Sequence, residues 1–140
     1  MSPEQKALIA VLRAAGRLNR QIGAFMEAHG LTAAQYNVLR ILRGAGGHLP
    51  IMTIRDRMMS PEPSITRLVD RLEAKGLVER HRQTEDRRCV ECRLTREGLS
   101  LVSELDRPVD ELDQRLMSDL TTRQQSTLAH LSDRVGTDEG

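Results

Sequence analysis

The stretch from Pro63 to Thr95 limits the possible folds of this chain more than any other. Its first part carries apolar residues at helical spacing, which gives a helix one stripe to bury: Ile65, Leu68, Val69 and Leu72. Gly76 follows where a left-handed residue would end that helix. Two segments of strand character, residues 78–83 and 89–94, come next. A helix joined to a β-hairpin in this order predicts a winged helix.

Capping boxes, in which Ser or Thr is followed three residues later by Gln, begin three predicted helices. With the apolar spacing that follows each box, the helices cover residues 2–28, 32–43 and 121–135. A short strand at 48–50 and a brief helix at 51–58 are predicted between the second box and the winged-helix stretch.

Pro108 lies inside a further predicted helix, which Thr95 caps. Proline removes one backbone hydrogen bond and crowds the carbonyl four residues before it. We therefore expect a kink or a break between Glu104 and Pro108.

Four segments in this order resemble the MarR family of bacterial transcription regulators: LTAAQYNVLRIL, PSITRLVDRLEAKGLVER, the DRR of the hairpin tip, and RLTREG. The resemblance implies a mainly α fold with a small β-hairpin, in which a winged helix-turn-helix is flanked by N- and C-terminal dimerisation helices. Residues 1–140 would then form one domain. Its expected parts are a DNA-binding lobe at 30–96, dimerisation helices at 2–28 and 97–135, and a frayed tail at 136–140.

The charge of the chain changes sign along its length. Residues 1–66 carry 8 basic and 4 acidic side chains, residues 67–96 carry 9 and 6, and residues 97–140 carry 4 and 10. Basic residues thus gather where nucleic acid would lie, and the acidic last part would be repelled from phosphate. The longest apolar run, from Ala7 to Leu12, is too short to span a bilayer, and no secretory signal pattern is present. We therefore expect a cytoplasmic protein that does not contact membranes.

The exposed face of the helix after Pro63 carries groups that suit DNA. Arg67 and Arg71 lie one turn apart, and an arginine fork can bind guanine or phosphate. Ser64 and Thr66 lie near the positive end of the helix, which favours phosphate or base contacts. Because residues 59–63 contain two prolines, the sequence determines the first residue of this helix only to within about three positions. A dimer would place two such helices about one turn of DNA apart, so the expected site in double-stranded DNA is an inverted repeat.

The hairpin tip is predicted to make a second contact. A short turn can deliver a guanidinium into the narrow minor groove of A·T-rich DNA. The resemblance implies that Asp86 orients Arg88 for this role, and we assign Arg87 to a phosphate.

The resemblance also implies release of DNA when a small effector, often aromatic or phenolic, enters a cleft between the dimerisation helices and the lobe. Phe25, His29 and Tyr36 flank that junction. With one Phe, one Tyr and no Trp in the chain, aromatic lining is scarce. A core or staple role for Phe25 and Tyr36, with His29 exposed at a helix end, is the favoured alternative.

Cys89 and Cys92 have the spelling of a C-x-x-C motif, but three steps along a strand turn their sulfurs to opposite faces. We therefore predict no zinc site, and no other metal or cofactor. Cys92 is expected in the core. Cys89 lies beside the basic tip, which favours a reactive thiolate, so a redox-responsive regulator is one alternative.

The sequence contains no nucleophile elbow, phosphate loop, H-E-x-x-H motif or dinucleotide fingerprint, and we do not expect an enzyme. We expect a dimeric regulator, most simply a repressor relieved by an effector. A winged helix that binds another protein, or DNA without sequence preference, is the other alternative. The hydroxyl-rich helix and the wing arginine favour specific binding.

Overall fold

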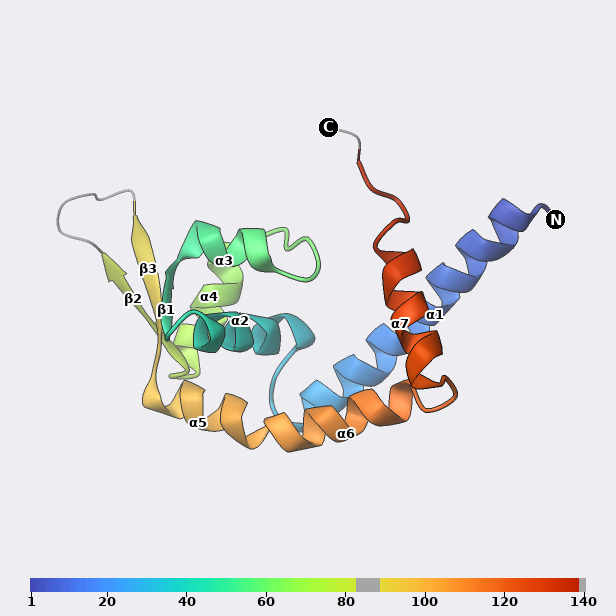
Figure 1. Cartoon of the computed structure of the whole chain (residues 1–140). Helices are drawn as coiled ribbons and strands as arrows, with labels where there is room; N and C mark the ends of the chain where they lie inside the picture. The colour runs from blue at the N-terminus through green and yellow to red at the C-terminus, as the bar shows by residue number, and fades with distance from the viewer. Residues whose placement is uncertain (83–88, 139–140) are drawn as a thin grey trace. The chain divides into compact units, whose positions relative to one another are not determined.

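The computed structural model describes residues 1–82 and 89–138, and it is mainly helical with a small antiparallel sheet, as predicted (Figure 1). The chain divides into two compact units, Met1–Glu104 and Leu105–Gly140. The first unit contains α1 (Pro3–Ala28), α2 (Ala33–Gly44), β1 (His48–Pro50), α3 (Ile51–Arg57), α4 (Ile65–Ala74), β2 (Val78–Arg82), β3 (Val90–Leu94) and α5 (Arg96–Glu104). The second contains α6 (Asp106–Leu116) and α7 (Thr122–Ser132).

All three predicted capping boxes are present. In the first, the Ser2 hydroxyl accepts from the amide of Gln5 at 3.2 Å, and the Gln5 side chain accepts from the amide of Ser2 at 3.1 Å. The boxes that begin at Thr32 and Thr121 repeat this arrangement. These local signals therefore located the starts of α1, α2 and α7, and α2 ends one residue later than predicted, at Gly44.

The sheet has three antiparallel strands in the order β1-β3-β2, so the predicted short strand at 48–50 adds to the hairpin. Cys92 in the central strand lies opposite Leu49 of β1 and Arg80 of β2. Cys92 is fully buried, as expected for the core. In Figure 1, α2, α3 and α4 lie on one side of this sheet.

The core of the first unit is made by the apolar faces of these helices. The apolar stripe predicted for α4 is buried, and so is Tyr36, for which a core or staple role was the favoured alternative. Leu31, just before α2, is buried as well. In α3, Ile54 is fully buried, whereas Ile51 and the C-cap residue Met58 are half-buried.

The end of α4 is fixed by two sets of hydrogen bonds. Gly76 has a φ of 75°, and the amide of Leu77 donates to the carbonyl of Leu72 at 3.0 Å, which is the glycine stop that the sequence predicted. Lys75, the C-cap residue, donates to the Gln35 side chain at 2.9 Å and to a backbone carbonyl in the α1–α2 turn. The C-terminal end of α4 is therefore joined to the start of α2.

The break predicted near Pro108 is also present. α5 ends at Glu104, and α6 begins at Asp106, which makes Pro108 the third residue of the new helix. At that position a missing N–H leaves no intrahelical bond unmade. Leu99, in the first turn of α5, is 46% exposed. None of the described helices is long and apolar enough to cross a membrane.

Candidate nucleic-acid interface

α4 presents the residues predicted to contact DNA on its exposed side. Its N-cap is Ser64, whose hydroxyl oxygen accepts from the amide of Arg67 at 3.2 Å. The helix therefore begins at Ile65, which fixes the start that the two prolines left open. Thr66, Arg67 and Arg71 are exposed, while the opposite face of α4 is buried. The Ser64 hydroxyl still has its proton to donate, because the cap uses only its oxygen lone pair.

α3 and the connection to α4 complete a helix-turn-helix. The Asn37 side chain in α2 accepts from the amide of Met59 at 2.9 Å, which ties this connection to the core. Arg55 and Arg57 in the last turn of α3 are exposed and add positive charge beside the connection. No DNA contact was predicted for these two arginines, because a seven-residue helix without a side-chain cap gives only a weak local signal.

Arg80 joins β2 to α4, and no role was predicted for it from the sequence. Its backbone N–H and its Nη1 donate to the two carboxylate oxygens of Glu73, both at 3.0 Å. Its Nη2 donates to the backbone carbonyl of Thr66 at 3.0 Å and pairs with Asp70 Oδ1 at 2.5 Å. The side chain of Arg80 is only 23% exposed. Strand alternation offered a signal, since it places Arg80 on the same face as the buried Val78, where a charge needs partners.

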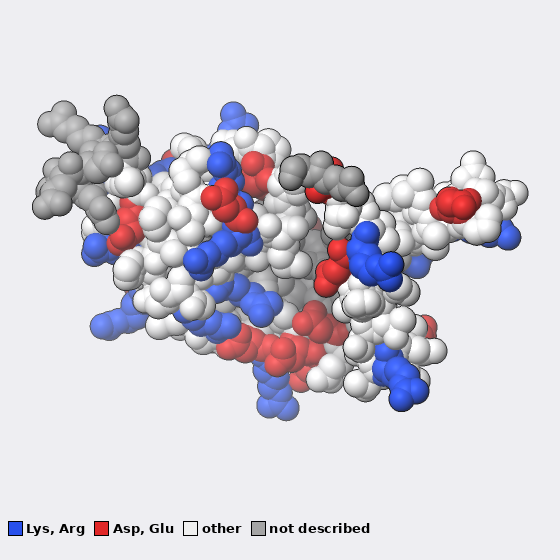
Figure 2. All heavy atoms as spheres, turned by 45° about the horizontal axis from the view of Figure 1, so that its top comes forward, with Lys and Arg blue, Asp and Glu red and all other residues white. Residues whose placement is uncertain are grey.

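Arg67 and Arg71 differ from Arg80 in being exposed and unpaired. Within the part of the chain that the structure describes, no ion pair or hydrogen bond holds either guanidinium. Figure 2 shows Lys and Arg side chains scattered among uncharged and acidic ones rather than gathered into one continuous patch. Binding to DNA would therefore depend on where individual arginines stand more than on a uniformly basic face.

The predicted wing residues Asp86, Arg87 and Arg88 lie outside the described residues, so their contact with DNA stays a prediction. The structure does describe the strands that lead to them. β2 ends at Arg82 and β3 begins at Val90, one residue later than the sequence suggested.

The three candidate effector residues have different surroundings. The rings of Phe25 and His29 lie 4.8 Å apart between centroids at an angle of 48°. Tyr36 is buried and has the Arg40 guanidinium carbon 5.9 Å from its ring centroid, which agrees with the staple role. His29 is the exposed C-cap of α1, also as expected. Binding of an effector by these residues stays a prediction.

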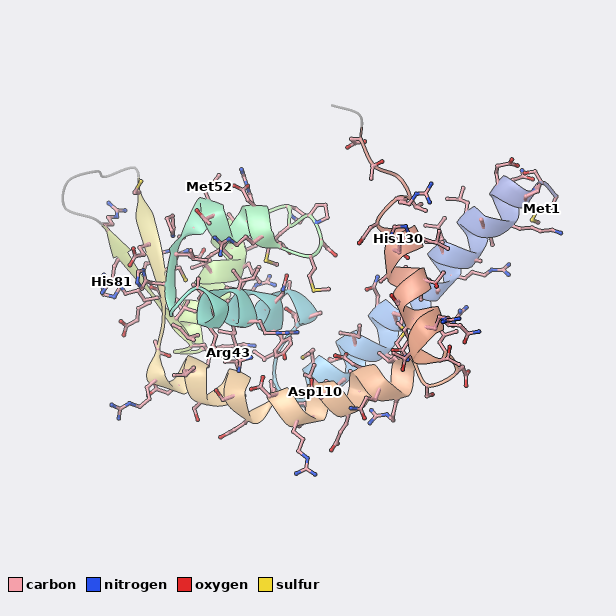
Figure 3. All side chains as sticks on the ribbon, viewed as in Figure 1. Met1, Arg43, Met52, His81, Asp110 and His130 are labelled. Atoms are coloured by element: carbon pink, nitrogen blue, oxygen red, sulfur yellow. The ribbon has the colours of Figure 1, made fainter. Side chains whose placement is uncertain are left out.

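A cavity of about 500 Å³ lies elsewhere in the first unit, between the last turn of α2, the glycine turn at 46–47 and the start of α5. Arg43, which is part of its lining, is at the end of α2 that faces α5 in Figure 3, whereas His81 lies on the outer side of the hairpin. None of the residues predicted from the sequence to contact DNA or an effector lines this cavity.

The two cysteines have opposite surroundings, as predicted. Cys89 is exposed, and Cys92 is fully buried. Burial raises the pKa of the Cys92 thiol from 9.0 to about 11, while the Arg80 cation opposes that rise and the Glu73 carboxylate adds to it. The redox role considered for Cys89 stays a prediction.

Raising the pH from 8 to 11 is expected to destabilise the natural protein more than a Cys92→Val variant. The folded pKa of about 11 lies above the unfolded value of 9.0, so the stability contributed by the buried neutral thiol is complete below pH 9 and is lost as the pH rises through 11. This difference corresponds to about 2 to 3 kcal/mol. Urea unfolding of both proteins at pH 8 and pH 11 measures it, and equal losses in the two proteins would contradict the assignment.

Comparison with known proteins gives one consistent result. A family model described as "MarR family" matches residues 29–88. The repressor MdtR of Bacillus subtilis is 34% identical over 110 residues, 79% of this chain and 70% of that protein. The multiple antibiotic resistance protein MarR of Salmonella typhimurium is 30% identical over 118 residues, 84% and 81%. The solved structure of a mutant MarR from E. coli complexed with operator DNA is 26% identical, covers 91% of each chain and superposes with a TM-score of 0.81.

Proposed function

Since this chain belongs to the MarR family of DNA-binding transcription regulators, we propose that it represses transcription as a cytoplasmic homodimer bound to an inverted-repeat operator. The observation that carries the proposal is the exposed side of α4, where Arg67 and Arg71 stand unpaired on a helix that is buried on its other face. One similar protein is named as a repressor, which supports repression rather than activation.

In the proposed complex, α4 lies in the major groove. Arg67 and Arg71 bind guanine edges or phosphates through their forked guanidiniums. Thr66 and Ser64 bind a phosphate or a base near the N-terminus of α4, where the helix dipole favours phosphate. Ser64 donates its hydroxyl proton in this contact. The buried face of α4 and its two hydrogen-bonded ends fix the position of the helix that carries these side chains.

Exposed apolar faces on two helices support the homodimer. In α1, Leu8 and Leu12 are one turn apart and are 56% and 62% exposed. In α7, Leu128 and Leu131 are one turn apart and are 42% and 49% exposed. Val135, which was predicted in the same helix, is exposed but lies beyond the last helical residue, Ser132. Each face has the spacing of a helix that packs on another, and a second copy of the chain offers the same faces in return.

Operator symmetry tests this proposal directly. The purified protein is titrated against a duplex from its upstream intergenic region, against the same duplex with one half-site scrambled, and against one with five base pairs inserted between the half-sites. Five base pairs turn the second half-site to the opposite side of the helix. We expect both altered duplexes to bind much more weakly than the intact repeat. Equal binding to the intact and half-scrambled duplexes would show that the protein reads a single site.

Arg88→Ala is expected to weaken operator binding by about 1 to 3 kcal/mol, because it removes the predicted minor-groove contact. Arg107→Ala is the matched control. It makes the same change in charge on an exposed residue of the acidic second unit, whose partner is Glu111. Fluorescence titration against the operator compares the three proteins. If Arg88→Ala binds as tightly as the natural protein, the assignment of the wing arginine is wrong.

A small aromatic or phenolic effector is the second part of the proposal. The Phe25–His29 ring pair at the C-terminal end of α1 supports it, since it places a ring face beside an imidazole. Thermal-shift measurements with aromatic acids and phenols test for binding. A compound that raises the melting temperature of the natural protein, but not of Phe25→Leu, would support this site. If no compound of these classes shifts the melting temperature, the effector proposal is dropped.

A further inference from the structure

We propose that Arg80 is a positioning residue that neutralises Asp70 and so keeps the DNA-reading side of α4 attractive to DNA. This inference rests on the proposed function, since it concerns how α4 meets the operator. Arg80 itself makes no contact with DNA in this proposal, because its guanidinium is mostly buried and engaged with protein oxygens.

Asp70 needs neutralising because of where it lies. It is 57% exposed, follows Arg67 by three residues and immediately precedes Arg71. An unpaired carboxylate there would repel phosphate. It would also stand at the i, i+3 distance at which a carboxylate attracts the guanidinium of Arg67 away from DNA. The pair with Arg80 Nη2 at 2.5 Å removes both effects.

The position of Arg80 is determined by more than this one pair. Glu73 binds its backbone N–H and Nη1, and the Thr66 carbonyl binds the same Nη2 that pairs with Asp70. These three partners are spaced by four and three residues, so they follow one side of α4. The cation is therefore held beside Asp70 by contacts that do not involve Asp70. Arg67, by contrast, stays exposed and unpaired in the described part of the chain.

Charge neutralisation can be separated from simple cross-linking of β2 to α4. Arg80→Met removes both, and we expect it to weaken operator binding about tenfold or more, the scale of one lost charge contact. Adding Asp70→Asn removes the exposed carboxylate without restoring the cross-link, and we expect this double variant to regain affinity to within about threefold of the natural protein. Arg80→Met with Glu73→Gln has the same net charge, but its lost carboxylate is one turn further along α4, so it should stay weak.

Three results of these titrations would contradict the role given to Arg80 and Asp70. If Arg80→Met/Asp70→Asn binds as weakly as Arg80→Met, the role is mechanical and the inference is wrong. If both double variants recover equally, only net charge matters and the assignment to Asp70 is wrong. Asp70→Asn alone keeps Arg80 and its other contacts, so it gives a test even if Arg80→Met does not fold. We expect its affinity to equal or exceed that of the natural protein, and a loss of affinity would contradict the inference.

The same titrations on a scrambled duplex keep this inference distinct from the proposed function. Repulsion between a carboxylate and phosphate does not depend on sequence, so the order of the variants should be the same on both duplexes. A natural protein that binds the two duplexes equally would refute the proposed function, while the order of the variants would still test the role of Arg80.

Discussion

Replacing both Leu8 and Leu12 by glutamate is expected to convert the protein to a monomer and to weaken operator binding at least about a hundredfold. Both side chains are more than half exposed on α1, and a charged pair cannot be buried against a second copy. A dimer binds its second half-site as an intramolecular step, and loss of this advantage typically costs a factor of about 10² to 10⁴ in affinity. Light scattering after size-exclusion chromatography, followed by operator titration, measures both effects.

Lys6→Glu is the control for this experiment. It changes the net charge by the same two units in the same helix, but Lys6 is an exposed charged residue off the apolar stripe. We expect Lys6→Glu to remain dimeric and to lose much less affinity. If the double glutamate variant stays dimeric, the exposed stripe of α1 is not the interface, and the assignment of α1 as a dimerisation helix is wrong.

Gly98→Ala is expected to lower the free energy of unfolding by about 3 kcal/mol or more. A Cβ at this position would lie 2.2 Å from the backbone oxygen of Leu77 and 2.8 Å from Leu94 Cδ1. The Leu77 oxygen cannot easily move, because it accepts from the amide of Thr95 at 3.1 Å. The Thr95 hydroxyl in turn accepts from the amide of Gly98 at 3.0 Å and donates to the Gly76 carbonyl at 2.7 Å. The hairpin and the start of α5 are thus packed backbone to backbone.

Gly44→Ala provides the matched control for that prediction. Gly44 is the last residue of α2, its φ is not in the left-handed region, and a Cβ there would meet nothing within 4 Å. Alanine at such a site is expected to stabilise by about 0.4 to 1 kcal/mol, because it restricts the unfolded chain. Denaturant unfolding of the three proteins separates the two cases. A Gly98→Ala protein as stable as Gly44→Ala would contradict the close packing at the base of the hairpin.

Much of the fold was predictable because its boundaries are set by local chemistry. Ser2 and Thr121 begin helices through side-chain hydrogen bonds that span three residues, and the Gly76 stop and the break before Pro108 need only backbone geometry. The apolar stripe of α4 gave the side of the helix that is buried, and therefore also the side that carries Arg67.

The parts that were missed depend on contacts between residues distant in the sequence. Arg80 reaches Thr66 fourteen residues away, and Lys75 reaches Gln35 forty residues away. No role was predicted for Glu91, which is buried, with Nδ1 of His48 in β1 3.4 Å from its Oε1. A charged residue in a sequence does not indicate whether it meets solvent or a partner, because that depends on which strand and helix are brought beside it.

This regulator is expected to bind DNA with sequence specificity. The most direct measurement is the affinity of the natural protein for its upstream intergenic duplex and for a scrambled duplex of the same composition, across a series of salt concentrations. We predict at least about a thousandfold preference for the intergenic duplex at physiological salt. Equal affinities, falling with salt along one steep slope, would mean that only phosphates are contacted and would contradict the claim.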